Sequence, residues 1–207
     1  MDSYNYSKTA QVSFGDLPRL IQETCLEVLR ALPGQSNEYM TYSNSGSEAI
    51  SWSNIAVHQI VGSLKNAFES VQHLGERKAL EAVAERLCAN TSRNLQDDIA
   101  DWRVWIDSFS GSGLRWESIG LLWVHLERVS DTFAAFRGRR LAWSENRQSK
   151  GIARSHVGYC IQLATFFNAA NDLLVDLLRR KATMNSHIDG DAGKFALLKL
   201  CDETLTP

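Results

Sequence analysis

The scarcity of proline is the feature that most limits how this chain can fold. Its 207 residues contain three prolines, and none lies between Pro33 and Pro207. Proline breaks a helix interior because it lacks a backbone N–H and its ring clashes with the preceding turn. Long helices are therefore permitted almost throughout the chain.

Apolar residues recur at helical spacing in the first half of the chain. We expect a first helix capped by Asp16 and ended by Pro33-Gly34, followed by a polar loop over 35–49 and a helix that stops near Gly75. The expected apolar stripes are Leu17, Leu20, Ile21, Cys25, Val28, Leu29 and Leu32; Ile60, Val61, Leu64, Phe68 and Val71; Leu80, Val83, Ala84, Leu87 and Cys88; and Leu95, Ile99, Trp102, Ile106 and Phe109.

Residues 110–113 break the pattern, and the most apolar segment follows from Leu114 to Phe136. Its apolar residues occupy more than one face around 119–124, which is typical of a helix at the centre of a bundle. We expect a basic, irregular loop over 137–154 and a last strong helix over 157–178. No period-two alternation is long enough for a strand. The sequence predicts an all-α fold, a multi-helix bundle of about six or more antiparallel-packed helices.

The expected organisation is a flexible N-terminus over 1–13, a helical domain over 14–185 and a tail or truncated extension over 186–207. Composition is globular, with 44% hydrophobic and 22% charged residues. A net charge of −2 argues against a domain that grips nucleic acid by itself, which usually carries a strongly basic face. No secretory signal and no apolar run of the ~20 residues that span a bilayer is seen, so a soluble intracellular protein is expected.

Motifs for catalysis or metal binding are missing from the sequence. The four cysteines, Cys25, Cys88, Cys160 and Cys201, are too far apart for a zinc knuckle or a redox C-x-x-C pair, so buried, inert thiols are expected. The run from His125 to Glu127 lacks the P-C-x-x-C partner of a zinc deaminase. The acidic run beginning at Asp189 lacks the later ligands of a calcium loop. We therefore expect no enzyme activity, no cofactor and no bound metal.

The basic residues between Arg137 and Arg154 permit two interpretations. They could form a nuclear import signal or a phosphate-contacting patch. A solvated loop between helices explains them equally simply, and we take this second interpretation as the expectation.

One stretch, F-S-G-S-G-L-R-W-E-S-I-G-L-L at 109–122, is more specific than composition. It resembles the F-[TS]-G-x-N-L-R-W-E-x-I-G signature of the fungal-specific transcription factor domain, the helical middle region of zinc-cluster regulators. Short motifs at 90–92 (N-T-S), 160–163 (C-I-Q-L), 171–174 (N-D-L-L) and 188–191 (I-D-G-D) look like further landmarks of that family. The signature residues, to which the resemblance gives a structural role, are Gly111, Gly113, Leu114, Arg115, Trp116, Glu117 and Gly120.

Elementary physics gives this signature an architectural meaning. The glycines permit a sharp turn between two helices, Leu114 and Ile119 point into the core, and Trp116 packs a large surface that carries one N–H to satisfy. Side chains that are two positions apart on a helix face in different directions. We therefore expect Arg115 and Glu117 not to pair with each other. Each is expected to bond to another helix or to a helix end.

The resemblance implies a transcription-regulator-like protein, located in the nucleus and controlling a fungal secondary-metabolite gene cluster. The family's cysteine-rich, two-zinc DNA reader has no counterpart in this sequence, and the chain stops soon after the I-D-G-D landmark. We therefore expect action through protein partners, such as a homodimer or another transcription regulator, without direct DNA binding and without a membrane. A helical scaffold domain, a small-ligand-binding protein and an unrecognised helical enzyme remain the alternatives.

Overall fold

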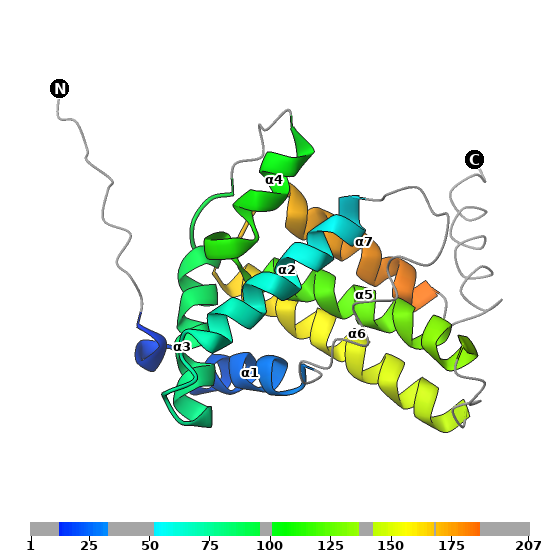
Figure 1. Ribbon diagram of the computed structural model, residues 1–207, viewed down its shortest axis with the longest axis horizontal. Coiled ribbons are helices and arrows are strands. Elements are labelled where there is room, and N and C mark those ends of the chain that lie inside the picture. Colours follow the sequence, from blue (N-terminus) through cyan, green and yellow to red (C-terminus); the bar gives the residue numbers. More distant parts are fainter. Residues whose placement is uncertain (1–12, 33–51, 96–100, 137–142, 168, 187–207) are drawn as a thin grey trace, which may run out of the picture.

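The computed structural model describes residues 13–32, 52–95, 101–136, 143–167 and 169–186, with the side chains of 129–149 set aside. Within these ranges the chain forms seven α-helices and no strand, which confirms the predicted all-α, multi-helix bundle (Figure 1). The helices are α1 Arg19–Arg30, α2 Trp52–Glu69, α3 Glu76–Thr91, α4 Trp102–Ser108, α5 Trp116–Phe136, α6 Trp143–Phe166 and α7 Asp172–Ser186. Short 3-10 turns cover Phe14–Asp16 and Gly111–Gly113.

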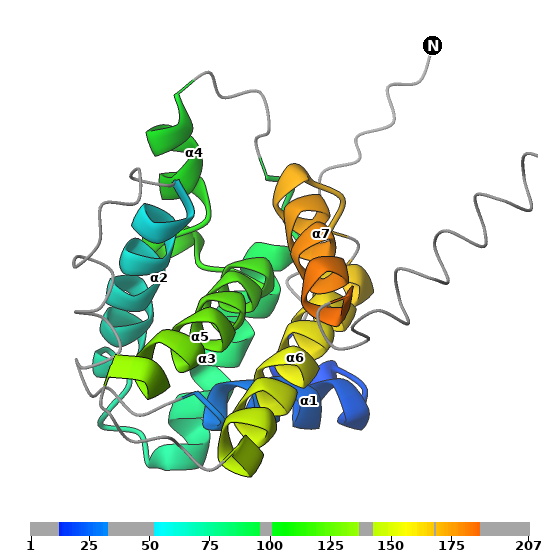
Figure 2. The same ribbon diagram turned by 90° about the vertical axis from the view of Figure 1, so that its right-hand side faces the viewer.

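Helix α5 occupies the centre of the bundle. Its residues 116–124 are all buried, as the apolar residues on several of its faces predicted. It runs antiparallel beside α6 (Figure 1), and Figure 2 shows α2 on one side of it, α6 and α7 on the other, and α3 behind it. The end of α5 that follows the 110–113 break is therefore surrounded by helices.

Gly120 of α5 lies against side chains of α7 and α6. A Cβ atom at this position would lie 2.4 Å from Leu177 Cδ2 and 3.3 Å from Cys160 Cβ. Both neighbours are fully buried, so neither can move into solvent. The missing side chain is thus what lets α6 and α7 pack tightly onto α5.

We expect Gly120→Ala to lower the free energy of unfolding by about 1–3 kcal/mol, because the new methyl group overpacks a closed core. The matched control is Gly62→Ala on α2, where no atom lies within 4 Å of the added Cβ. This control should be neutral or stabilising by about 0.5–1 kcal/mol. Urea denaturation followed by circular dichroism measures both, and equal stability of the two variants would contradict the packing argument.

The start of α1 differs from the prediction. Asp16 does not cap it but belongs to the preceding 3-10 turn, and α1 begins at Arg19. Pro18 explains the difference, because the residue before a proline is forced out of helical geometry, and Leu17 is indeed extended with ψ 151°. Leu20, expected on the buried stripe, is 77% exposed, whereas Leu26 is buried.

Three further predicted helix boundaries were wrong. The expected irregular loop over 137–154 is helical from Trp143, because Glu, Arg, Gln and Lys are good helix formers and no proline intervenes. The expected single helix over 157–178 is two helices, α6 and α7, and Asn171 caps the second. Where a helix was expected from Leu95 to Phe109, the described residues contain α4, which Asp101 caps by accepting a hydrogen bond from Arg103 N, and Leu95 itself is not helical; residues 96–100 lie outside the described residues.

Candidate functional site

Four buried polar residues meet where α3 ends and where α5 and α7 begin. They are Thr91, Arg115, Glu117 and Asn171, and we call them the helix-end cluster. Arg115 is 3% exposed and Glu117 is not exposed at all. Charged side chains are rarely buried to this extent unless they are paired, so the cluster is the most unusual polar feature of the described core.

Arg115 and Glu117 form a direct ion pair, so the prediction that they would not pair was wrong. Arg115 Nε donates to both carboxylate oxygens of Glu117, at 3.0 and 3.1 Å, and Nη2 lies 3.0 Å from Oε1. The helical spacing rule does not apply because α5 begins at Trp116, which leaves Arg115 just outside the helix. The bidentate contact fixes the orientation of both side chains.

Each partner also bonds to another element, as predicted. Arg115 Nη2 donates to the backbone oxygens of Thr91 and Arg93, at 3.1 and 3.3 Å, where α3 ends. Glu117 lies in the first turn of α5. A cation at a helix C-terminus and an anion at a helix N-terminus both interact favourably with the helix dipoles, so the pair joins two helix ends of opposite polarity.

Thr91 and Asn171 complete the cluster. Thr91 Oγ1 accepts a hydrogen bond from Trp116 N at 3.0 Å and lies 3.5 Å from Glu117 Oε2. Asn171 Oδ1 accepts from Leu174 N, which caps α7, and Asn171 Nδ2 donates to Glu117 Oε1 at 2.9 Å. One carboxylate thus holds groups from α3, α5 and α7 together.

The turn before α5 requires its glycines, as the signature predicted. Gly111 has φ +55°, a left-handed conformation that favours glycine. A Cβ on Gly113 would lie 2.3 Å from the backbone oxygen of Ser108. Asn90 Nδ2 donates to the backbone oxygens of Ser112 and Leu114, both at 2.8 Å, and so ties the turn to α3.

The remaining signature residues pack into the core of the bundle. Leu114 and Ile119 are buried, and Trp116 is fully buried with its Nε1–H directed at Cys88 Sγ, 3.4 Å away. Sequence reasoning missed Ser118, whose Oγ donates to Phe109 O at 2.6 Å and lies 3.4 Å from Arg115 N. Ser118 bonds back to the residue before the helix as in a capping box, but the S/T-x-x-E/Q residue types of that pattern are absent here, so the sequence carried no signal for it.

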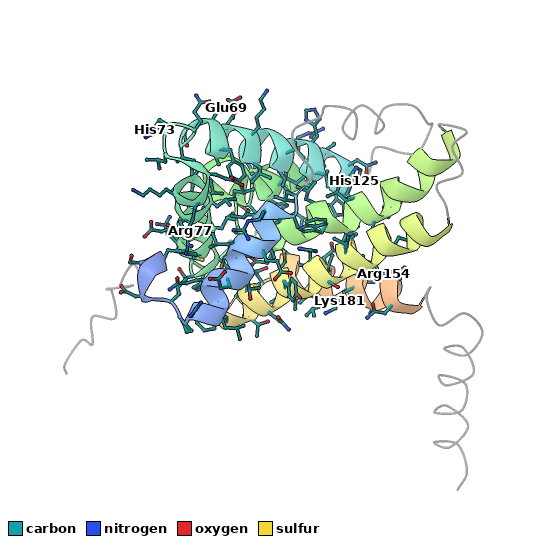
Figure 3. The ribbon with its side chains drawn as sticks, turned by 90° about the horizontal axis from the view of Figure 1, so that it is seen from below. Glu69, His73, Arg77, His125, Arg154 and Lys181 are labelled. Atoms are coloured by element: carbon teal, nitrogen blue, oxygen red, sulfur yellow. The ribbon has the colours of Figure 1, made fainter. Side chains whose placement is uncertain are left out.

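Other predicted features lie away from the cluster. Arg154 is not in a solvated loop but on α6, where it makes an ion pair at 2.9 Å with Glu127 of α5 (Figure 3). The arginines at 137–140 and the acidic run that begins at Asp189 lie outside the described residues. Cys25, Cys88 and Cys160 are buried as predicted, and Cys201 is outside the described ranges.

A small cavity and an open groove lie among the described residues away from the cluster. A water-sized cavity of about 10 Å³ lies between α2 and α5 and is bordered by His125, Arg128 and Arg180. An open groove of about 520 Å³ lies between α2 and α4. Its lining is Ile55, Gln59, Trp102, Arg103, Ile106 and Asp107. Across the described part of the chain, no three His, Cys, Asp or Glu side chains are arranged to hold a metal ion.

His125 makes stability depend on pH. Burial, together with the nearby Arg128 guanidinium, lowers the pKa of His125 below its ordinary value of 6.5. Below about pH 6.5 the His125 imidazole therefore binds a proton in the unfolded chain but not yet in the folded chain. The free energy of unfolding should consequently fall as the pH falls. Chemical denaturation between about pH 7.5 and pH 5 should show a weaker fall for His125→Gln.

The control for this prediction is His73→Gln, because His73 is exposed and lies at one end of the bundle (Figure 3). This variant should retain the pH dependence of the native chain. Identical pH profiles for His125→Gln and the native chain would show that His125 contributes nothing to it.

The chain has no detectable relative in three comparisons. No model of a known protein family matches it, and searches of curated proteins and of solved structures return no match. The resemblance to the fungal-specific transcription factor domain thus stays a prediction. None of the described helices is both long and apolar enough to cross a membrane.

Proposed function

We propose that this chain is a regulatory domain of the fungal-specific transcription factor type, acting in the nucleus through protein partners. The main support for it is that three of the short family-like motifs, although distant in sequence, each contribute a residue to the buried helix-end cluster. The N-T-S stretch supplies Thr91, the signature supplies Arg115 and Glu117, and the N-D-L-L stretch supplies Asn171. Motifs that join the same three helix ends fit a shared architecture better than separate chance matches.

The chemistry of the cluster favours a structural joint over a catalytic centre. Its carboxylate is already bonded to an arginine and an asparagine and lies close to a threonine hydroxyl. A reacting carboxylate needs access to a substrate, whereas Glu117 is fully buried. The proposal accordingly places the function on the outer helix faces, as contacts with a second copy or with another transcription regulator in a fungal secondary-metabolite gene cluster.

Tethering tests the transcriptional part of the proposal. The whole chain is fused to an unrelated DNA-binding domain and expressed in fungal cells with a reporter gene downstream of the matching site. We expect reporter transcript to change several-fold. Glu117→Ala should abolish the change, and Glu69→Ala, at an exposed ion pair with Lys65, should keep it. An unchanged reporter with a folded, expressed fusion would favour the scaffold interpretation.

A gel-shift measurement with the purified chain tests the expected lack of a DNA reader. We expect no sequence-selective shift, because the chain has a net charge of −2 and sequence readout normally rests on a basic surface. Tight, sequence-selective binding by the chain alone would overturn this part of the proposal.

A further inference from the structure

Two buried thiols face each other between α1 and α3. Cys25 Sγ lies 4.0 Å from Cys88 Sγ, and both side chains are inaccessible or nearly so, at 0% and 3% exposure. The two helices pack directly against each other, which brings together residues 63 positions apart. Both cysteines are free.

The surroundings of Cys88 distinguish it from Cys25. Cys88 Sγ accepts a hydrogen bond from Trp116 Nε1–H at 3.4 Å, and the thiol of Cys25 is placed to donate a second. These donors lower the pKa of Cys88, whereas donation to Cys88 and burial raise the pKa of Cys25. Because the thiolate is the nucleophilic form and the Trp116 N–H can stabilise a thiolate at Cys88, we expect Cys88 to react first with an oxidant.

We propose that Cys25 and Cys88 form an oxidation site, where a hydroperoxide converts the two thiols into one disulfide that joins α1 to α3. This inference does not rest on the proposed transcriptional role. It departs from the expectation of inert thiols, because a second thiol lies at a distance that rotation of the side chains and a small helix shift can close to the 2.05 Å of an S–S bond.

The reaction balances with hydrogen peroxide as the only co-reactant. The Cys88 thiolate attacks one peroxide oxygen, an S–O bond forms, the O–O bond breaks, and the departing hydroxide takes a proton to become water. Cys25 sulfur then attacks Cys88 sulfur, so that the S–S bond forms and the S–O bond breaks. The hydroxide that leaves takes the Cys25 proton as a second water. The two sulfurs together lose two electrons, and the two peroxide oxygens gain them.

Oxidation at Cys88 also reaches the helix-end cluster. Cys88 and Thr91 lie within one turn of α3, and Trp116 donates its indole N–H to Cys88 and its backbone N–H to Thr91. When Cys88 becomes part of a disulfide, the sulfur that accepts the Trp116 indole hydrogen bond changes, and Trp116 is the first residue of α5. Burial makes the reaction depend on transient opening of α1 from α3, so we expect it to proceed over minutes to hours.

The test uses the full-length chain carrying Cys201→Ser, treated with hydrogen peroxide at neutral pH, quenched by alkylation and analysed by peptide mass spectrometry. We expect a Cys25–Cys88 linked peptide, an intact mass lower by about 2 Da before alkylation, and a Cys160 that was reduced and is therefore alkylated. Cys160→Ala should still form the link, and Cys25→Ala should lose it. The same treatment in concentrated urea should give mixed pairings, which shows that the fold selects the pair.

Three outcomes would overturn the proposal. The first is that Cys25 and Cys88 remain free thiols in folded chain after prolonged treatment. The second is a Cys25–Cys160 link in their place. The third is accumulation of Cys88 sulfinic acid at the same rate with and without Cys25. The disulfide pairing measured in the chain that retains both Cys25 and Cys88 tests the proposal even if Cys25→Ala fails to fold.

Discussion

Glu117→Ala is expected to lower the free energy of unfolding by about 3–5 kcal/mol. The substitution leaves the Arg115 guanidinium buried without its carboxylate, and an uncompensated buried charge is strongly destabilising. It also removes the acceptor for Asn171 Nδ2, so the contact between α5 and the start of α7 is lost. Urea denaturation of the purified variant, followed by circular dichroism, gives the difference.

Two further variants separate the lost charge pair from a general loss of packing. Arg115→Met combined with Glu117→Leu removes both charges and keeps apolar volume, so we expect this double variant to be more stable than Glu117→Ala. Glu69→Ala breaks an exposed pair with Lys65 on α2 and should change stability by no more than about 0.5 kcal/mol. If the double variant is the least stable of the three, the pair itself carries net stability and the uncompensated-charge explanation is wrong.

Hydrophobic periodicity was sufficient to predict the buried faces of the central helices. The five stripe residues of α3, Leu80, Val83, Ala84, Leu87 and Cys88, are all buried, because each lies on one face at spacings of three and four. The continuous burial of 116–124 in α5 likewise follows from apolar residues on several faces. Burial of this kind depends on nearby sequence, which is why pattern reasoning finds it.

Contacts between distant segments were beyond the reach of pattern reasoning. The resemblance singled out Arg115 and Glu117, and local spacing predicted that they face apart. Their pairing depends on whether the helix begins before or after Arg115, and Thr91, 24 residues earlier, helps to set that boundary through Trp116 N and Arg115 Nη2. A helix start that is fixed by another helix cannot be located from its own neighbourhood.

The division between α6 and α7 shows the same limit. The apolar residues from Val157 to Leu178 continue at helical spacing across the break, so periodicity alone predicted one helix. Asn171 is the local signal that was missed, because its side chain caps Leu174 N. Its second bond, to Glu117, gives the chain a tertiary reason to start a new helix there.

Trp116→Ala is the second substitution with a large expected effect, a fall of about 3–5 kcal/mol in the free energy of unfolding. Trp116 is the largest fully buried side chain and lies where α5 begins beside the end of α3. Truncation removes a fully buried indole and leaves a cavity into which the surrounding helices relax only partly. Chemical denaturation measures the loss.

A milder change at the same position keeps part of the packing. Trp116→Phe retains an aromatic ring but loses ring volume and the Nε1–H that Cys88 accepts, so it should retain part of the stability that Trp116→Ala loses. Trp102→Ala is the matched control, because Trp102 is 37% exposed and its removal opens no closed cavity. If Trp102→Ala lowers the free energy of unfolding as much as Trp116→Ala does, then burial of Trp116 between α3 and α5 gives no special stability.

Because the thiol pair lies against the same indole, Trp116→Phe should also slow formation of the Cys25–Cys88 disulfide while leaving its pairing unchanged.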